Sequence, residues 1–322
     1  MRRREFIAGL GSAAAWPLAA RSRQQAVPVV GVLSSGSQAE AANISAFQEG
    51  LRSTGYDEGR NVVVAHRWSR TLSGRNAAIA TFVERRAAVI VTTVNSAAHA
   101  AKAATSTIPI VFFYGGDPVD EGLIASLNKP GSNLTGVTSF NIALGGKRLS
   151  LLGEMVPQAM TIAFLSGDST YLHHDEQRDQ LIGAGSALQR QIIVQEVRDD
   201  RNYEAAFKSF VQRHAGALIV GAFAFPNFKK IVELAARHKL PTIYPSRAYV
   251  AAGGLMSYSP LAADLYRVAG TYVGQILKGE KTANLPIMRA TRFKLVVNYK
   301  TAMTLGLAVP PNLLAIADEV IE

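Results

Sequence analysis

The chain has 322 residues, a formal net charge of +10 and a hydrophobic content of 48%, which is enough to bury two cores of ordinary size. It contains no cysteine, which excludes disulfide bonds, thiolate sites and a lipid anchor on an N-terminal cysteine. Residues 1–27 hold five arginines and one glutamate, so the rest carries 29 basic and 23 acidic residues. These are scattered rather than clustered, and we expect no nucleic-acid partner.

Residues 1–22 have the pattern of a bacterial signal peptide. Three arginines at 2–4 precede a short apolar stretch that ends in small residues, and the paired arginines before Phe6-Ile7 are typical of twin-arginine signals. A retained anchor is the alternative, but Pro17 interrupts the stretch, which is shorter than the ~20 residues that span a bilayer. We therefore predict export, cleavage after Ser22 within a few residues, and a soluble periplasmic protein.

Apolar runs alternate with helical patterns along the first half of the mature chain. The runs lie at 27–37, 61–68, 87–94 and 108–114, and the helical patterns lie around 47–51, 77–86 and 97–105. Continuous β-branched runs of this kind, alternating with helices, predict a parallel sheet that is covered on both faces.

The same order returns in the second half. The runs at 160–169, 191–197, 210–224 and 237–247 repeat the earlier ones, with an offset of 132 between Ser34 and Ser166 and again between Pro109 and Pro241. The repeat predicts an α/β fold of two doubly wound parallel-sheet lobes. We place 28–138 with 260–288 in lobe 1, and 139–259 with 289–322 in lobe 2.

Loops at the carboxyl ends of parallel strands line ligand crevices, so two such lobes would present their loops across a cleft. The chain would cross between lobes near 135–141, near 255–261 and again in its last ~35 residues. Gly136, Gly253 and Gly254 suit hinge positions.

The chain resembles the periplasmic substrate-binding proteins of ABC transporters, in particular the family whose members bind tryptophan or tyrosine, with an expanded rhizobial branch. The resemblance covers essentially the whole mature chain and rests on the stretches at 51–62, 108–138, 233–244, 249–260, 276–287 and 298–322. It implies a type I periplasmic-binding-protein-like fold that closes on a small solute and delivers it to an inner-membrane permease. It also implies a monomer without a cofactor.

The sequence departs from the family in two loops. Val94-Asn95-Ser96-Ala97 stands where Gly-Thr-Pro-Ala is common, and Gly167-Asp168-Ser169-Thr170 stands where an Asn-Pro pair is usual. Both loops border the predicted cleft. We therefore predict a small carboxylate or amino acid as the ligand, which need not be aromatic.

The predicted ligand-binding residues lie at strand ends. Asp117 precedes Pro118 and suits either a helix cap or a ligand contact, whereas bare backbone at Gly115 and Gly116 would let an anion approach a helix N-terminus. The serines suit capping or ligand contact, Asp168 suits an ammonium or a turn, and the aromatic residues suit core packing or stacking on a ligand. The full set is Ser35, Ser37, Asn95, Ser96, Tyr114, Gly115, Gly116, Asp117, Ser139, Asp168, Ser169, Phe223, Tyr244 and Tyr258.

Motifs for catalysis are absent from the sequence. No P-loop, GxSxG or HExxH is present, so we predict no enzymatic activity. His173-His174-Asp175-Glu176 is contiguous rather than spaced on one face, which favours a solvated helix start over a metal site. An exported sensor subunit that presents solute to a receptor kinase is the alternative function.

Overall fold

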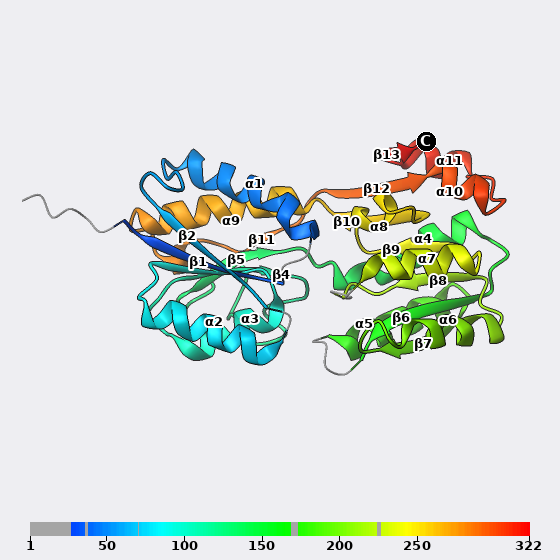
Figure 1. The fold of residues 1–322 in the computed structure, drawn as a ribbon, viewed down its shortest axis with the longest axis horizontal. Coiled ribbons are helices and arrows are strands. Elements are labelled where there is room, and N and C mark those ends of the chain that lie inside the picture. Colours follow the sequence, from blue (N-terminus) through cyan, green and yellow to red (C-terminus); the bar gives the residue numbers. More distant parts are fainter. Residues whose placement is uncertain (1–26, 36–37, 70, 169–172, 224–226) are drawn as a thin grey trace, which may run out of the picture.

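The computed structural model describes residues 27–35, 38–69, 71–168, 173–223 and 227–322. Within them the chain forms two α/β lobes that lie side by side along the long axis (Figure 1). The predicted Ser37 and Ser169 and the predicted signal peptide fall outside the described residues. No helix of the described part has the length and apolar character to span a bilayer.

The first lobe is built on a fully parallel sheet of six strands in the order β11-β5-β4-β3-β1-β2. Its strands are β1 (Val29–Ser34), β2 (Val63–Trp68), β3 (Val89–Thr92), β4 (Ile110–Tyr114), β5 (Leu134–Thr138) and β11 (Met288–Arg289). Its helices are α1 (Gln38–Ser53), α2 (Leu72–Glu84), α3 (Asn95–Ala104), α9 (Ala262–Leu277) and the short η2 (Thr282–Asn284). One apolar core packs α1 and α9 on one face of the sheet, and another packs α2 and α3 on the other.

The second lobe has a sheet of seven strands in the order β13-β12-β10-β9-β8-β6-β7. Its strands are β6 (Thr161–Gly167), β7 (Gln191–Val197), β8 (Ala217–Val220), β9 (Thr242–Tyr244), β10 (Met256–Pro260), β12 (Phe293–Asn298) and β13 (Glu319–Ile321). Its helices are η1 (Ile142–Leu144), α4 (Gly145–Met155), α5 (His174–Ala187), α6 (Tyr203–Gln212), α7 (Phe228–Arg237), α8 (Arg247–Ala251), α10 (Tyr299–Thr304) and α11 (Pro311–Ile316).

One pair in the second sheet departs from the expected parallel arrangement. Strand β12 runs antiparallel to β10. The chain leaves the first lobe after β11 and enters the second at the carboxyl end of β10, so β12 must run back along it. The repeat could not show this, because β12 lies beyond the repeated segment.

Three segments connect the lobes: 139–144, Leu261 and 290–292. The glycines expected at hinges lie outside them. Gly136 is inside β5, and Gly253 and Gly254 form the turn that leads into β10. Gly136 and Gly254 serve packing within a lobe, since a Cβ would lie 2.1 Å from the Phe112 carbonyl oxygen and 2.5 Å from the Tyr244 ring, respectively. Gly253 has a left-handed φ of +103°, which the turn requires.

The helix expected after Asp117 is absent. Residues 118–122 form turns instead, in which the Leu123 amide donates to the Pro118 carbonyl over 2.9 Å. Gly122 adopts a left-handed φ of +66°, and its carbonyl accepts from Lys102 Nζ. Because this conformation breaks the helical path, no helix N-terminus lies at Gly115-Gly116.

Helix α9 returns to the first lobe through backbone-to-backbone packing on α1. A Cβ on Gly270 would lie 2.0 Å from the Phe47 carbonyl oxygen, and one on Gly50 would lie 1.9 Å from the Arg267 carbonyl oxygen. Only glycine permits this approach, which docks a helix distant in sequence onto the first lobe.

We expect Gly270→Ala to lower the free energy of unfolding by about 1–3 kcal/mol, because the added methyl group forces the two helices apart. Gly183→Ala is the matched control. A Cβ there meets no atom within 4 Å, so alanine should stabilise α5 by roughly 0.5–1 kcal/mol. Chemical denaturation measures both. Equal stability of the two variants would contradict the close packing of α1 and α9.

Candidate ligand-binding site

The carboxyl ends of the two sheets face each other. Glu121, in the segment after β4, lies against His173, which follows β6, with 2.9 Å between Glu121 Oε1 and His173 Nε2. The ring of Tyr114, the last residue of β4, meets the His173 ring edge-on at 6.1 Å. The loops that line ligand crevices in such sheets therefore meet at the boundary between the lobes.

Within the first lobe, the predicted residues gather at this edge. Ser35 directly follows β1, Asn95 and Ser96 open α3, and Ser139 directly follows β5. Ser96 Oγ accepts a hydrogen bond from the Arg75 guanidinium of α2. The structure thus brings together polar side chains from several strand ends, as expected from the repeat.

The loop Tyr114-Gly115-Gly116-Asp117 is bonded within the protein. The Gly115 amide donates to Asn95 Oδ1 over 2.9 Å, and the Ser139 amide donates to the Tyr114 carbonyl over 2.8 Å. Asp117 Oδ1 accepts from the Val119 amide over 2.8 Å, which is the local cap that Asp favours. In this conformation these groups stabilise the loop itself.

The space beside Gly116 is filled by side chains from both lobes. A Cβ on Gly116 would lie 2.6 Å from Glu121 Oε1 and 2.9 Å from His173 Cε1. The glycine therefore makes room for this pair of side chains, a role that its position in the sequence did not suggest.

Tyr114 belongs to a buried polar network. Its hydroxyl donates to Glu121 Oε2 and lies 2.8 Å from His99 Nε2. Burial, together with the hydrogen bond to Glu121, raises the pKa of the Tyr114 phenol far above its usual value, so the hydroxyl remains protonated. The ring has no exposed surface in this conformation.

The second-lobe aromatic residues differ in accessibility. Tyr244 is buried and stacks on Tyr249 at 4.9 Å, so in this conformation it belongs to the core. Phe223 follows β8 and is 9% exposed. Tyr258, in β10, is partly exposed and stacks on Phe293 at 5.8 Å, while Asp168 follows β6 and is also partly exposed.

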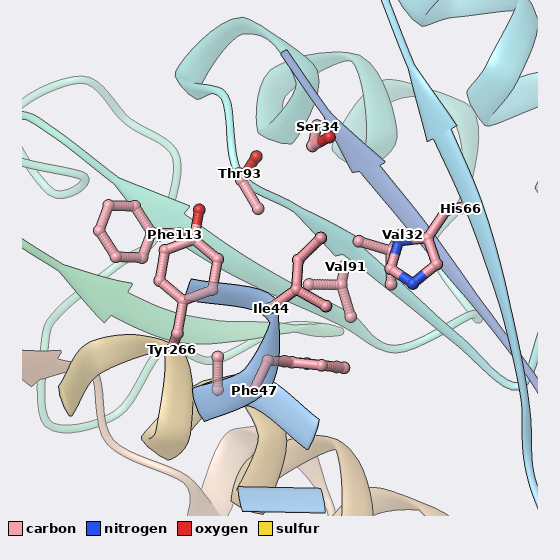
Figure 2. A pocket seen from close by; sticks show the side chains of 10 residues that line it. Val32, Ser34, Ile44, Phe47, His66, Val91, Thr93, Phe113 and Tyr266 are labelled. Atoms are coloured by element: carbon pink, nitrogen blue, oxygen red, sulfur yellow. The ribbon is translucent and has the colours of Figure 1, made fainter. Parts of the chain in front are cut away.

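A small pocket of about 30 Å³ lies at the carboxyl end of β1, β3 and β4, beneath α1 and α9 (Figure 2). Ser34 and Thr93 contribute hydroxyl groups at its edge, and the other walls are mostly apolar. Its lining consists of Val32, Ser34, Ile44, Phe47, His66, Val91, Thr93, Phe113, Tyr266 and Ala269. Ser34 and Thr93 lie within the apolar runs 27–37 and 87–94, but the sequence pattern gave no sign that a hollow would lie beside α1 and α9.

Comparison with known proteins identifies the family. The family model described as ABC transporter substrate binding protein matches residues 5–321. The chain belongs to this family. The predicted resemblance is therefore confirmed.

This substrate-binding protein is similar to several characterised relatives. It is 24% identical, over 81% of its length and 75% of the relative, to a tyrosine-binding protein of Clostridioides difficile. It shares its fold with an ABC domain from Streptococcus pneumonia in complex with L-Trp, with a TM-score of 0.84, 25% identity and coverage of 91% of this chain and 99% of that one. A ligand-free, open substrate-binding protein from Clostridium difficile gives a TM-score of 0.67 at 23% identity, over 92% and 99% of the two chains. These likenesses confirm the predicted fold class.

In this substrate-binding protein a buried arginine ties the connecting segment 139–144 to β10, the strand that leads into Leu261. Arg148 of α4 is 1% exposed, and its Nε donates to the Tyr258 carbonyl over 3.0 Å. Its two terminal nitrogens donate to the carbonyl and side-chain oxygens of Asn141. Burial lowers the pKa of Arg148, but the guanidinium remains protonated at neutral pH.

The third connecting segment is attached to the other two. The guanidinium of Arg289, the last residue of β11 and directly before this segment, lies over the Phe140 ring at 4.7 Å from its centre, and the Leu261 amide donates to the Arg292 carbonyl over 2.9 Å. The three segments therefore form one bonded unit between the lobes.

Proposed function

We propose that the protein is the exported, non-enzymatic solute receptor of an ABC importer, which closes its two lobes on a small amino acid or related carboxylate. The observation that carries this proposal is that the carboxyl edges of two sheets face each other across three bonded connecting segments. The lobe boundaries are those proposed from the sequence, and the sheet membership of the strands supports them. The receptor acts as a monomer and delivers its solute to a permease in the inner membrane.

The first-lobe pocket suggests where the apolar end of a ligand lies. Its walls are mainly aliphatic and aromatic, and Ser34 and Thr93 stand at its edge. We place the ligand body at this pocket and its carboxylate near Ser35, Asn95 and Ser96. Phe223 and Tyr258 would contact the ligand from the second lobe. The apolar walls suit an amino acid with an apolar side chain, in line with the tyrosine and L-Trp named for the relatives, but at about 30 Å³ the pocket has to widen before it can take a whole side chain.

A thermal-shift screen of the twenty amino acids, followed by calorimetry, tests the ligand class. A true ligand at 100 times its dissociation constant should add about 2.7 kcal/mol of stability. Ile44→Trp should fill the pocket and weaken binding by at least about tenfold. Ile182→Trp is the control, because Ile182 is 41% exposed on α5, and it should bind normally. Unchanged affinity in Ile44→Trp would exclude the pocket, and no binding by any amino acid would contradict the proposed ligand class.

The proposed export depends on the signal peptide predicted at residues 1–22. We expect the triple change of Arg2, Arg3 and Arg4 to Lys to retain the precursor in the cytoplasm, because twin-arginine signals are read by a receptor. Cell fractionation followed by immunoblotting measures the distribution. Normal export of the triple variant would contradict a twin-arginine route.

A further inference from the structure

Glu121 and His173 form an ion pair between the lobes at a distance from the connecting segments. Glu121 lies between β4 and β5 in the first lobe, and His173 precedes α5 in the second. Their side chains are 16% and 4% exposed, and Glu121 Oε1 lies 2.9 Å from His173 Nε2. The ring N–H is not directed at the carboxylate oxygen, so the contact is electrostatic rather than an aligned hydrogen bond.

Both ring nitrogens of His173 face carboxylates. Nε2 lies beside Glu121, and Nδ1 lies 3.1 Å from Glu176 Oε2 on the first turn of α5. Tyr114 of β4 packs edge-on against the ring of His173. His99 of α3 contacts the Tyr114 hydroxyl through its Nε2. Two carboxylates this close to the ring favour its charged, imidazolium form through their negative charge.

Separation of the lobes would remove one of the two carboxylates from His173. Glu176 belongs to the same helix and would stay with the ring, whereas Glu121 belongs to the other lobe. Burial opposes the charge on His173, but Glu121 and Glu176 outweigh it and raise the pKa of the imidazole. The part of this shift that comes from Glu121 exists only while the lobes are together.

We propose that Glu121 and His173 form a protonation-dependent latch that holds the two lobes closed. The proposal rests on the lobe closure of the proposed function. Because the closed state has the higher pKa, the latch is fully formed below the pKa of the open state and is lost as the pH rises through the closed-state pKa. Ligand affinity should therefore fall as the pH rises through this range.

The test measures the radius of gyration of the mature, ligand-free protein by small-angle X-ray scattering at about pH 5.5 and about pH 8.5, on either side of the ordinary histidine pKa. We expect the wild-type protein to expand at the higher pH. His173→Gln and Glu121→Gln should be equally expanded at both pH values. Gly116→Ala retains both charges but crowds the pair, and it should also expand the molecule at the lower pH.

His174→Gln is the matched control. His174 pairs with Glu196 at 3.0 Å within the second lobe, so its loss should leave the wild-type pH response intact. A wild-type radius that does not change with pH, or the same change in His173→Gln, would overturn the latch. The readout needs no ligand, so failure of every amino acid to bind would contradict the proposed function without affecting this result.

Discussion

The guanidinium of Arg148 bonds the first segment that joins the lobes to β10, the strand that leads into the second such segment. A buried cation is costly unless its donors are satisfied, and here they are met by oxygens of Asn141, in the segment 139–144, and of Tyr258, in β10. Loss of either partner would leave part of the buried guanidinium without an acceptor. Arg148 thereby helps to fix the first connecting segment against β10, and we expect the lobes to move by rotation about the connecting segments.

The position of the connecting segments determines where the two lobes can separate. The connecting segments enter and leave at β5, β10, β11 and β12, while β2 and β7 form the opposite edges of the two sheets. The polar network of Tyr114, Glu121 and His173 lies between the connecting segments and these opposite edges. A small rotation of the lobes would separate them there. The loop that follows β4 therefore contributes a contact between lobes, and the apolar pocket at β1, β3 and β4 is the better place for a ligand body.

The sequence predicted the architecture well because the repeat is a property of the hydrophobic pattern, which also determines the sheets. It did not predict the turns after Asp117. The Asp-Pro pair has the signature of a helix start, but the left-handed Gly122 and the bond from Lys102 override it. Tertiary contacts also determine the environment of the His173 side chain. The polar run 173–176 begins α5 as expected, but the prediction that it is solvated is wrong for His173, since its side chain is buried between two carboxylates. The pocket was missed because it depends on how closely α9 approaches α1.

The distance between two spin labels tests whether solute binding brings the two lobes together. The chain lacks cysteine, so Leu72→Cys and Asn202→Cys would carry the labels on exposed positions that follow the edge strands β2 and β7. Double electron–electron resonance would compare the ligand-free protein with the protein saturated by the amino acid that binds most tightly in calorimetry. We expect a shorter and narrower distance distribution on binding. A ligand that binds and leaves the distribution unchanged would contradict it.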